Sequence, residues 1–231
     1  MTNWKLALPE MVTRVTFNSF ELPEELFTWL KEACEEAKQK GNTANNYLVG
    51  HIKEEHHLIG NTPSGEQVYF VDINKNFINF LLQCTTSKLL QKHLNKINCL
   101  SSNKPLYLHD LWVNHMKKHE FNPPHSHSGA LSFVIFIKIP YDLKAEEDQF
   151  PLTREMTLDE SYNIQMKNHT SKFAFLNTRS DGTISVDCIN VDKSFEGKML
   201  MFPSPQIHQV FPFYTSDDYR ITVSGNIRIK V

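Results

Sequence analysis

The sequence predicts a mainly β protein with helices in its N-terminal part, an α+β arrangement whose core is formed by strands. Before Pro105 apolar residues recur at helical spacing, whereas after it come short runs rich in β-branched and aromatic residues, separated by Pro, Gly, Asn and Asp. The chain has 231 residues and 40% hydrophobic composition, which favours one large domain, or one domain with an N-terminal extension. We expect residues 1–104 to form a helical or mixed segment that packs on a β core of residues 105–231, as one structural unit.

The N-terminal segment is expected to begin with a short strand and to continue as helix. The strand-like run spans residues 12–17, and Pro23 followed by Glu24 and Glu25 is a typical helix start, with proline at the first helical position. A single apolar stripe follows at helical spacing: Leu26, Trp29, Leu30, Ala33 and Ala37. Residues 74–97 repeat this spacing and fit one helix or two.

Residues 48–65, LVGHIKEEHHLIGNTPSG, show no pattern that identifies an element. His56 and His57 follow two glutamates in this segment. Charged clusters of this kind usually lie on solvated loops. We therefore expect the two histidines to mark a solvated turn rather than a second metal site.

After Pro105 the chain predicts seven or eight strands and no helix, which is typical of an all-β sandwich or a small barrel. The long, charged stretch 141–170 interrupts this series and is expected to form a lid, because long loops in compact domains are usually functional. The runs that predict strands are LYLHDLWVNHM, LSFVIFIKI, KFAFLNT, TISVDCINV, KMLMF, HQVFPF and YRITVSGNIRIKV.

Composition and charge exclude several classes of function. Lys and Arg total 24 against 26 Asp and Glu, so no basic excess indicates a nucleic-acid partner. No run approaches 18 consecutive apolar residues, so we expect no membrane span. The four cysteines contain no CxxC pair, which favours reduced thiols. We expect a soluble cytoplasmic protein, in the host cytoplasm if a phage encodes it, and leave a homodimer open.

The segment NPPHSHSG places His125 and His127 two residues apart behind a double proline. Residues i and i+2 of a strand point to the same face, so both imidazoles would lie on one side. The prolines restrict such a strand to a sheet edge or a barrel mouth. Two imidazoles there form half of a metal site, although the same pair also suits a surface loop. His115 and His119 are expected at the surface.

A third histidine and an arginine complete the pattern near the C-terminus. His208 begins one strand-like run, and Arg220 lies twelve residues further along, within the last one. A strand arginine flanked by apolar residues is costly to bury without an anion, and a guanidinium suits a carboxylate because it donates two parallel hydrogen bonds. A metal beside a carboxylate anchor on a small β-barrel is the chemistry of an iron- and 2-oxoglutarate-dependent oxygenase.

The segments WVNHMKKHEFNPPHSHSGALSFVIFIKIP and MLMFPSPQIHQVFPFYTSDDYRITVSGNI resemble the 2-oxoglutarate/iron(II)-dependent oxygenases common in bacteria and in phages of marine cyanobacteria. The resemblance covers the chain from Tyr107 to its end, and LVGHIKEEHHL is similar to the N-terminal half of that group. It implies a double-stranded β-helix (jelly-roll) core with the metal and the co-substrate at its open mouth.

This resemblance also assigns roles to individual residues. It implies that His125, His127 and His208 bind Fe(II), and that Arg220, with Thr222 in an R-x-[ST] pattern, binds the distal carboxylate of 2-oxoglutarate. O2 would be the other co-substrate, and succinate and CO2 the products. Asn114 shares a strand face with Trp112, so it is a candidate for a further hydrogen bond to the co-substrate or, equally, an ordinary strand amide.

One departure from the family pattern leaves alternatives open. The wider superfamily has a carboxylate two residues after the first histidine, where this chain has His127. Three neutral histidines also suit zinc or cupin-like chemistry. The alternatives are a cupin-like metalloenzyme that does not use 2-oxoglutarate and a non-catalytic jelly-roll module, such as a phage structural or glycan-binding protein. For an oxygenase, a protein side chain, a nucleotide and a small metabolite are all open as substrates.

Overall fold

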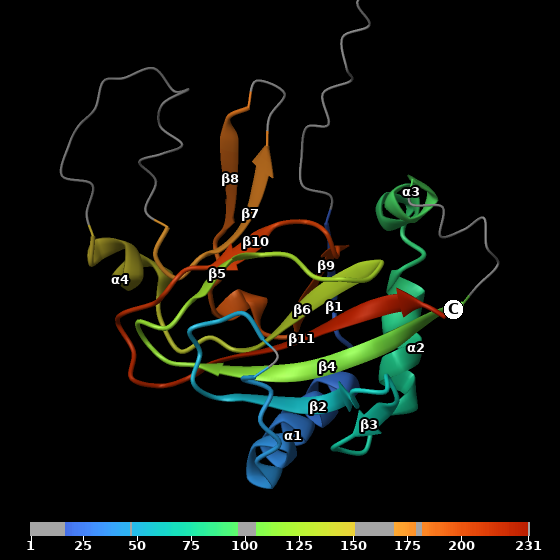
Figure 1. Cartoon of the computed structure of the whole chain (residues 1–231). Coiled ribbons are helices and arrows are strands. Elements are labelled where there is room, and N and C mark those ends of the chain that lie inside the picture. The colour runs from blue at the N-terminus through green and yellow to red at the C-terminus, as the bar shows by residue number, and fades with distance from the viewer. Residues whose placement is uncertain (1–16, 47, 97–104, 151–168, 179–181, 231) are drawn as a thin grey trace, which may run out of the picture.

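The computed structural model describes residues 17–46, 48–96, 105–150, 169–178 and 182–230 (Figure 1). The strands are β1 (Asn18–Glu21), β2 (Glu55–Asn61), β3 (Gln67–Tyr69), β4 (Leu106–Met116), β5 (Asn122–His125), β6 (Leu131–Lys138), β7 (Phe173–Thr178), β8 (Ile184–Ile189), β9 (Lys198–Pro203), β10 (His208–Val210) and β11 (Arg220–Ile229). The helices are α1 (Glu24–Lys40), α2 (Lys75–Cys84), α3 (Lys88–Lys96) and α4 (Leu143–Asp148), and a 3-10 turn spans Lys193–Phe195.

Two antiparallel sheets form the mainly β core. The seven-stranded sheet has the order β1-β9-β6-β11-β4-β2-β3, and the four-stranded sheet has the order β5-β10-β7-β8. From β4 to β11 the chain passes back and forth between the two sheets, a winding consistent with a double-stranded β-helix. The sheets meet through aromatic rings, since Phe173 and Phe175 of β7 contact Phe202 of β9.

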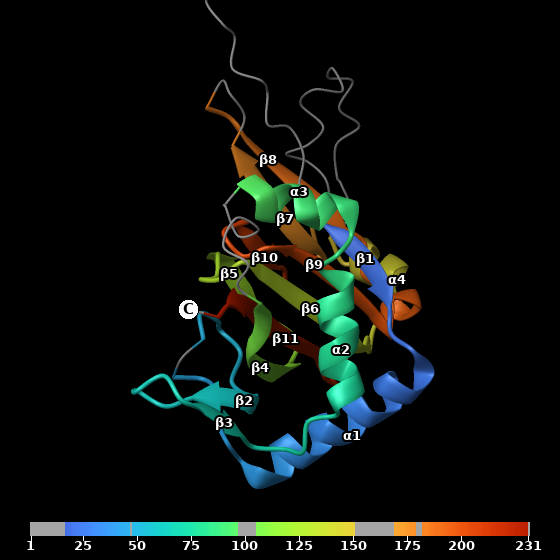
Figure 2. The same cartoon turned by 90° about the vertical axis from the view of Figure 1, so that its right-hand side faces the viewer.

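The seven-stranded sheet is covered on its other face by helices. In Figure 1 it lies between α1 and the four-stranded sheet, and Figure 2 shows α1 and α2 against its outer side. The buried side chains of this layer come from both the helices and the sheet: Leu26, Leu30, Phe77 and Leu81 pack with Leu111, Val113, Ile135 and Val223. Alternate residues of β4 therefore face two different surroundings, a helical layer and the interior between the sheets.

The N-terminal segment departs from expectation in its details. The structure begins β1 at Asn18, and residues 12–16 of the expected strand lie outside the described residues. Pro23 occupies the N-cap position of α1, one residue before the first helical position. The 74–97 region forms two helices, and the side chain of Asn74 caps α2 by accepting a hydrogen bond from the N–H of Asn76 at 2.9 Å.

Residues 48–65 contain strand β2, so the expected solvated turn is wrong. His56 and His57 lie in β2, which pairs with β4 in the seven-stranded sheet. Strands β1, β2 and β3 thus join residues from before Pro105 to the same sheet as the later strands. The division into 1–104 and 105–231 stays a prediction.

The stretch 141–170 begins with helix α4, where no helix was expected. Asp142 caps this helix by accepting a hydrogen bond from the N–H of Ala145 at 2.9 Å. Residues 151–168, the greater part of the expected lid, lie outside the described residues. Within the part of the chain that the structure describes, none of the helices has both the length and the apolar character needed to cross a membrane.

Candidate active site

Three histidines meet where the ends of β5 and β10 lie side by side. His125 ends β5 and lies directly opposite His208, the first residue of β10, in antiparallel register. The backbone N–H of His127 donates to the carbonyl oxygen of Ser204 at 2.9 Å, which holds the residue beyond the end of β5. The ring centroids are separated by 4.3 Å for His125 and His208, and by 5.0 Å for each of the other pairs.

The geometry directs free nitrogen lone pairs to the centre of this group. Nδ1 of His125 lies 2.7 Å from the carbonyl oxygen of Pro123, and Nδ1 of His208 lies 3.0 Å from that of Gln206. Because a carbonyl oxygen only accepts hydrogen bonds, we assign the proton to Nδ1 in both rings, which leaves each Nε2 unprotonated. One nitrogen from each of the three rings lies within 4.8 Å of the others, so together they could hold a metal ion.

Burial keeps these imidazoles neutral. It lowers the pKa of His208 to about 3, with the two neighbouring histidines adding to the effect. It likewise lowers the pKa of His127 to about 4, together with the nearby His125. Phe173 stacks on the ring of His208 and Phe202 meets it edge-on, with centroids 5.7 and 4.8 Å away. A neutral imidazole in an apolar wall has its lone pair available for a metal.

A narrow cavity of about 40 Å³ joins the three histidines to the other residues that the sequence singled out. All six of these residues line it: Asn114, His125, His127, His208, Arg220 and Thr222. They come from β4, β5, β10 and β11 and from the turn after β5, so residues more than a hundred positions apart in sequence share one cavity. The structure therefore brings together every residue of the expected site.

Arg220 is a buried cation that has no carboxylate partner among the described residues. It is the first residue of β11, the central strand of the large sheet, rather than an interior residue of that strand, and it is only 1% exposed. Its Nη1 donates to the carbonyl oxygen of Ser171 at 3.0 Å. Among the described residues, no Asp or Glu forms an ion pair with it, and its Nε has no hydrogen-bond partner. Burying a guanidinium in this way is costly unless an anion binds it.

Polar groups from β4 and β11 lie beside Arg220. Asn114 and Thr222 are directly opposite each other in the ladder, and the Asn114 amide donates to the Thr222 hydroxyl oxygen at 3.3 Å. The amide oxygen of Asn114 is buried and has no hydrogen-bond partner among the described residues. These groups supply a hydroxyl and an amide at the arginine end of the cavity, where a bound carboxylate could use them.

A second hollow of about 330 Å³ shares His125, His127 and Trp112 with this cavity. It is also lined by Asp110, whose pKa is raised to about 6 by burial, against the opposing effect of hydrogen bonds from Asn226. Sequence reasoning did not identify Asp110. The carboxylate alternates with Trp112 and Asn114 on one face of β4, and that spacing is the signal that would have pointed to it.

Two of the other histidines lie where the sequence did not place them. His115 is buried, at 1% exposure, although a surface position was expected, whereas His119 is exposed as expected. His56, expected in a solvated turn, is also buried. Glu55 was missed as well: burial, with a smaller contribution from Glu120, raises its pKa to about 7. His56 and His115 share one cause, because they lie on the face of the sheet that packs toward α1, whereas Glu55 is opposite Asn114 and lies on the other face.

Comparison with solved structures shows the fold. OsALKBH1 superposes with a TM-score of 0.53 at 11% identity, over 93% of this chain and 99% of that one. A Pseudomonas putida prolyl-4-hydroxylase superposes with a TM-score of 0.50 at 12% identity, over 94% of each chain. The search of curated proteins returned no match.

A family model described as "Putative 2OG-Fe(II) oxygenase" matches residues 110–226, just over half of the chain. The match begins at Asp110 and ends at Asn226, so it spans all six residues that line the cavity. Members of this family are enzymes that use Fe(II), 2-oxoglutarate and O2. The chain therefore belongs to the 2OG-Fe(II) oxygenase family.

Proposed function

We propose that this enzyme is a 2-oxoglutarate-dependent hydroxylase in which His125, His127 and His208 bind Fe(II). The observation that carries the proposal is the cavity shared by three neutral imidazoles and a buried arginine, for which the described part of the chain offers no carboxylate partner. The donor set fits the metal, because neutral imidazoles are good ligands for divalent iron and two of the three rings are oriented by backbone carbonyls.

Arg220 would bind the distal carboxylate of 2-oxoglutarate, assisted by Thr222 and Asn114. Its Nε forms no hydrogen bond within the described residues, and the Asn114 amide already orders the Thr222 hydroxyl. A charge-assisted hydrogen bond to a carboxylate is stronger than a neutral one, and Arg can supply two in parallel. The cavity of about 40 Å³ has room for about one water molecule, so side chains that line it would have to move aside for the co-substrate.

The chemistry that bound iron would supply is oxidative decarboxylation of 2-oxoglutarate by O2 to succinate and CO2, in which one oxygen atom enters succinate and the other hydroxylates a substrate C–H bond. The protein's own contribution is to position the reactants and to limit the access of water to the proposed metal ligands. Phe173 and Phe202 shield His208 from water, and Trp112, whose ring centroid lies 5.7 Å from that of His127, covers the other side. This aromatic wall limits the access of water to the His208 side of the site, which would favour reaction with the bound substrate.

The three-histidine ligand set supports one competing function, a cupin-like metalloenzyme that does not use 2-oxoglutarate. Most non-haem oxygenases of this kind use two histidines and a carboxylate, whereas this site offers a third imidazole. In the competing function Arg220 would bind a carboxylate of the substrate itself. Both functions require the metal, and only the first requires 2-oxoglutarate to bind beside it.

Anaerobic addition of Fe(II) and 2-oxoglutarate separates these functions. Chelation of iron by 2-oxoglutarate produces a weak visible charge-transfer band, which the proposal predicts for the wild type and not for His208→Ala. Binding of Fe(II) without the band, at saturating 2-oxoglutarate, would support the cupin-like function. Absence of Fe(II) binding would contradict both.

A further inference from the structure

A second group of side chains that could bind a metal lies on the seven-stranded sheet, on the face turned away from the active-site cavity. Glu54 directly precedes β2, His56 lies within it, and His115 lies in the neighbouring strand β4. The N–H of His115 donates to the carbonyl oxygen of Glu54 at 2.9 Å, and His56 is opposite Val113 in the antiparallel ladder. Val113 belongs to the layer packed under the helices, so His56 and His115 project toward α1 rather than into the active-site cavity.

The two histidines are buried, and within the described residues their ring nitrogens form no hydrogen bond. His115 is 1% exposed and His56 is 9% exposed. In the described part of the chain, none of their four ring nitrogens has a hydrogen-bond partner. Buried polar atoms are nearly always satisfied in folded proteins, and leaving them unpaired costs about 1–3 kcal/mol each. A metal ion bound by one nitrogen of each ring would satisfy two of these four nitrogens.

The carboxylate of Glu54 completes the group. One ligand atom from each of the three residues lies within 4.8 Å of the others, and Nε2 of His56 is 3.5 Å from the carboxylate. The hydroxyl of Tyr219 donates to the second carboxylate oxygen at 2.7 Å. A hydrogen bond of this kind orients a carboxylate ligand, as outer partners commonly do around bound metals.

The surroundings of Glu54 and His115 determine the protonation states of both side chains. Partial burial acts to raise the pKa of Glu54, but hydrogen bonds from Lys38 and Tyr219 lower it to about 2, so the carboxylate is ionised. Burial, with the Lys38 ammonium nearby, lowers the pKa of His115 to about 4, so this imidazole is neutral. An ionised carboxylate and a neutral imidazole are the forms that bind a divalent cation.

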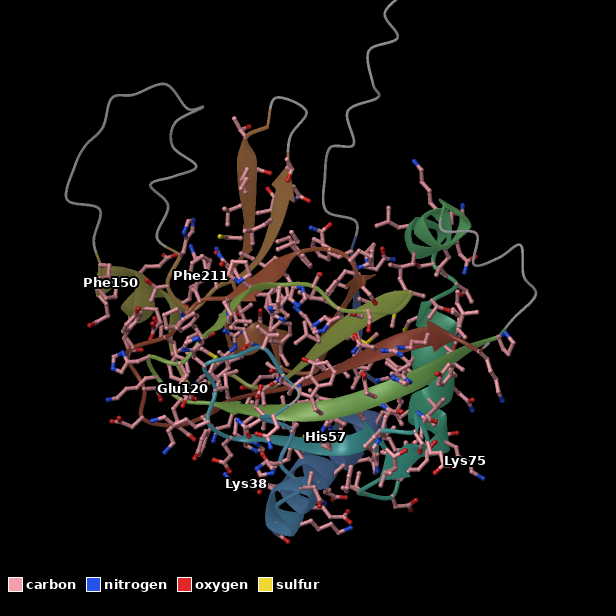
Figure 3. The ribbon with its side chains drawn as sticks, in the orientation of Figure 1. Lys38, His57, Lys75, Glu120, Phe150 and Phe211 are labelled. Carbon is pink, nitrogen blue, oxygen red and sulfur yellow. The ribbon has the colours of Figure 1, made fainter. Side chains whose placement is uncertain are left out.

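Lys38 competes for this position. Its ammonium lies 2.9 Å from Glu54 and 4.4 Å from the ring centroid of Tyr219. It reaches them from near the end of α1 (Figure 3), and its side chain is 34% exposed. A long, partly exposed lysine can withdraw into solvent when a divalent cation takes its place beside the carboxylate. The Lys38 ammonium would therefore compete with a divalent cation for the Glu54 carboxylate, so cation binding should depend on Lys38.

We propose that Glu54, His56 and His115 form a second metal site that binds Zn²⁺, with Tyr219 as a positioning residue. Two imidazoles and one carboxylate are a common zinc ligand set that leaves a fourth position open. Glu54, His115 and Tyr219 also line a surface hollow of about 1030 Å³, from which water or a ligand can reach that position. This site is distinct from the proposed iron site and does not depend on it.

Zinc content measured by elemental analysis, after equilibrium dialysis, tests this proposal. The wild type and His119→Ala should each retain one more equivalent of zinc than His56→Ala/His115→Ala. His119 is the matched control, since it lines the same hollow but is exposed. The proposed iron site is tested separately by His125→Ala/His208→Ala, which should lose a different equivalent. Equal zinc content in the wild type and in His56→Ala/His115→Ala would overturn the second site.

Two further variants test the site without removing a buried ligand, in case His56→Ala/His115→Ala does not fold. Lys38→Ala should tighten zinc binding, because it removes the competing ammonium, while Lys40→Ala on the same helix should leave it unchanged. Tyr219→Phe should weaken zinc binding by about 10-fold through loss of the hydrogen bond to Glu54. Zinc affinities that are the same in Lys38→Ala and Lys40→Ala would contradict the proposal.

Discussion

At the scale of single residues, the functional proposal rests on how each histidine is held. His125 and His208 each pair their Nδ1 with a carbonyl two residues earlier in the chain, so local backbone geometry leaves Nε2 of both rings as the nitrogen that could bind a metal. The third proposed ligand, His127, has no such bond among those of the described residues, and its position depends instead on its backbone contact with Ser204. We therefore expect the first two to be the more strictly required ligands.

Replacement of His125 or His208 with Ala should abolish stoichiometric binding of Fe(II) or Mn(II). Each substitution removes one of three nitrogen ligands and leaves the backbone ladder between β5 and β10 in place. Calorimetric titration of Mn(II) into each variant measures the loss, with circular dichroism to check folding and His119→Ala as the control. Undiminished binding in both variants would rule out this metal site.

Asp110 gives a prediction for the dependence of stability on pH. Its folded pKa is about 6, raised mainly by burial, above the value of an unfolded aspartate. The folded state therefore binds more protons between about pH 4 and 6, and stability falls as pH rises through this range. Asp110→Asn removes this titration, so the loss of unfolding free energy from pH 4 to pH 7 should be smaller by about 2 kcal/mol. Urea denaturation at pH 4 and pH 7 measures the unfolding free energy of the wild type and of Asp110→Asn. Equal losses of unfolding free energy in the two proteins would refute the prediction.

At the scale of elements, the later strands could be predicted from the sequence and the edge of the large sheet could not. Strands such as β6 are almost wholly apolar and bounded by turn residues, which makes them readable. Strand β2 is EHHLIGN, with polar residues buried on both faces, so it shows neither alternation nor an apolar run. Strand β2 is buried because α1 and β4 pack against it, and the residue pattern of β2 alone does not indicate this packing.

The same reasoning explains which site residues the sequence could identify. His125, His127, His208 and Arg220 were found because their residue types and spacing match a known chemistry. His56 and His115 were misplaced because sequence spacing does not show which face of a strand a helix will cover. Glu54 and His56 are two residues apart in the chain, and only the pairing of β2 with β4 brings His115 to them.

Gly225 tests the packing of β11 at the centre of the large sheet. A Cβ at this position would lie 2.6 Å from the ring of Phe133 and 2.7 Å from the backbone oxygen of Asp110, and the latter cannot move without distorting β4. Gly225→Ala should therefore lower the free energy of unfolding by about 1–3 kcal/mol. Urea denaturation measures the change, with Ile184→Ala on the exposed surface of β8 as a control expected within about 0.5 kcal/mol of the wild type. A Gly225→Ala protein as stable as the wild type would contradict this packing.

At the scale of the whole molecule, the fold assembles the site from separate parts of the chain. The four-stranded sheet supplies His125 and His208, and the seven-stranded sheet supplies Asn114, Arg220 and Thr222. Neither sheet alone contains both the proposed metal ligands and the proposed carboxylate anchor. The cavity between the two sheets is therefore where a metal and a dicarboxylate could be held together.

The proposal that this cavity holds a metal and 2-oxoglutarate together is tested most directly by calorimetry. 2-Oxoglutarate is titrated into the Mn(II)-loaded wild type, Arg220→Ala and Arg220→Lys. Loss of the guanidinium should weaken 2-oxoglutarate binding by roughly 1.5–3 kcal/mol, or about 10–150-fold, while Mn(II) binding stays almost intact because Arg is not a metal ligand. Arg220→Lys should recover only part of the loss, since it keeps the charge but not the two parallel donors. A wild type that does not bind 2-oxoglutarate, or binds it no better than Arg220→Ala, would contradict the proposed co-substrate site.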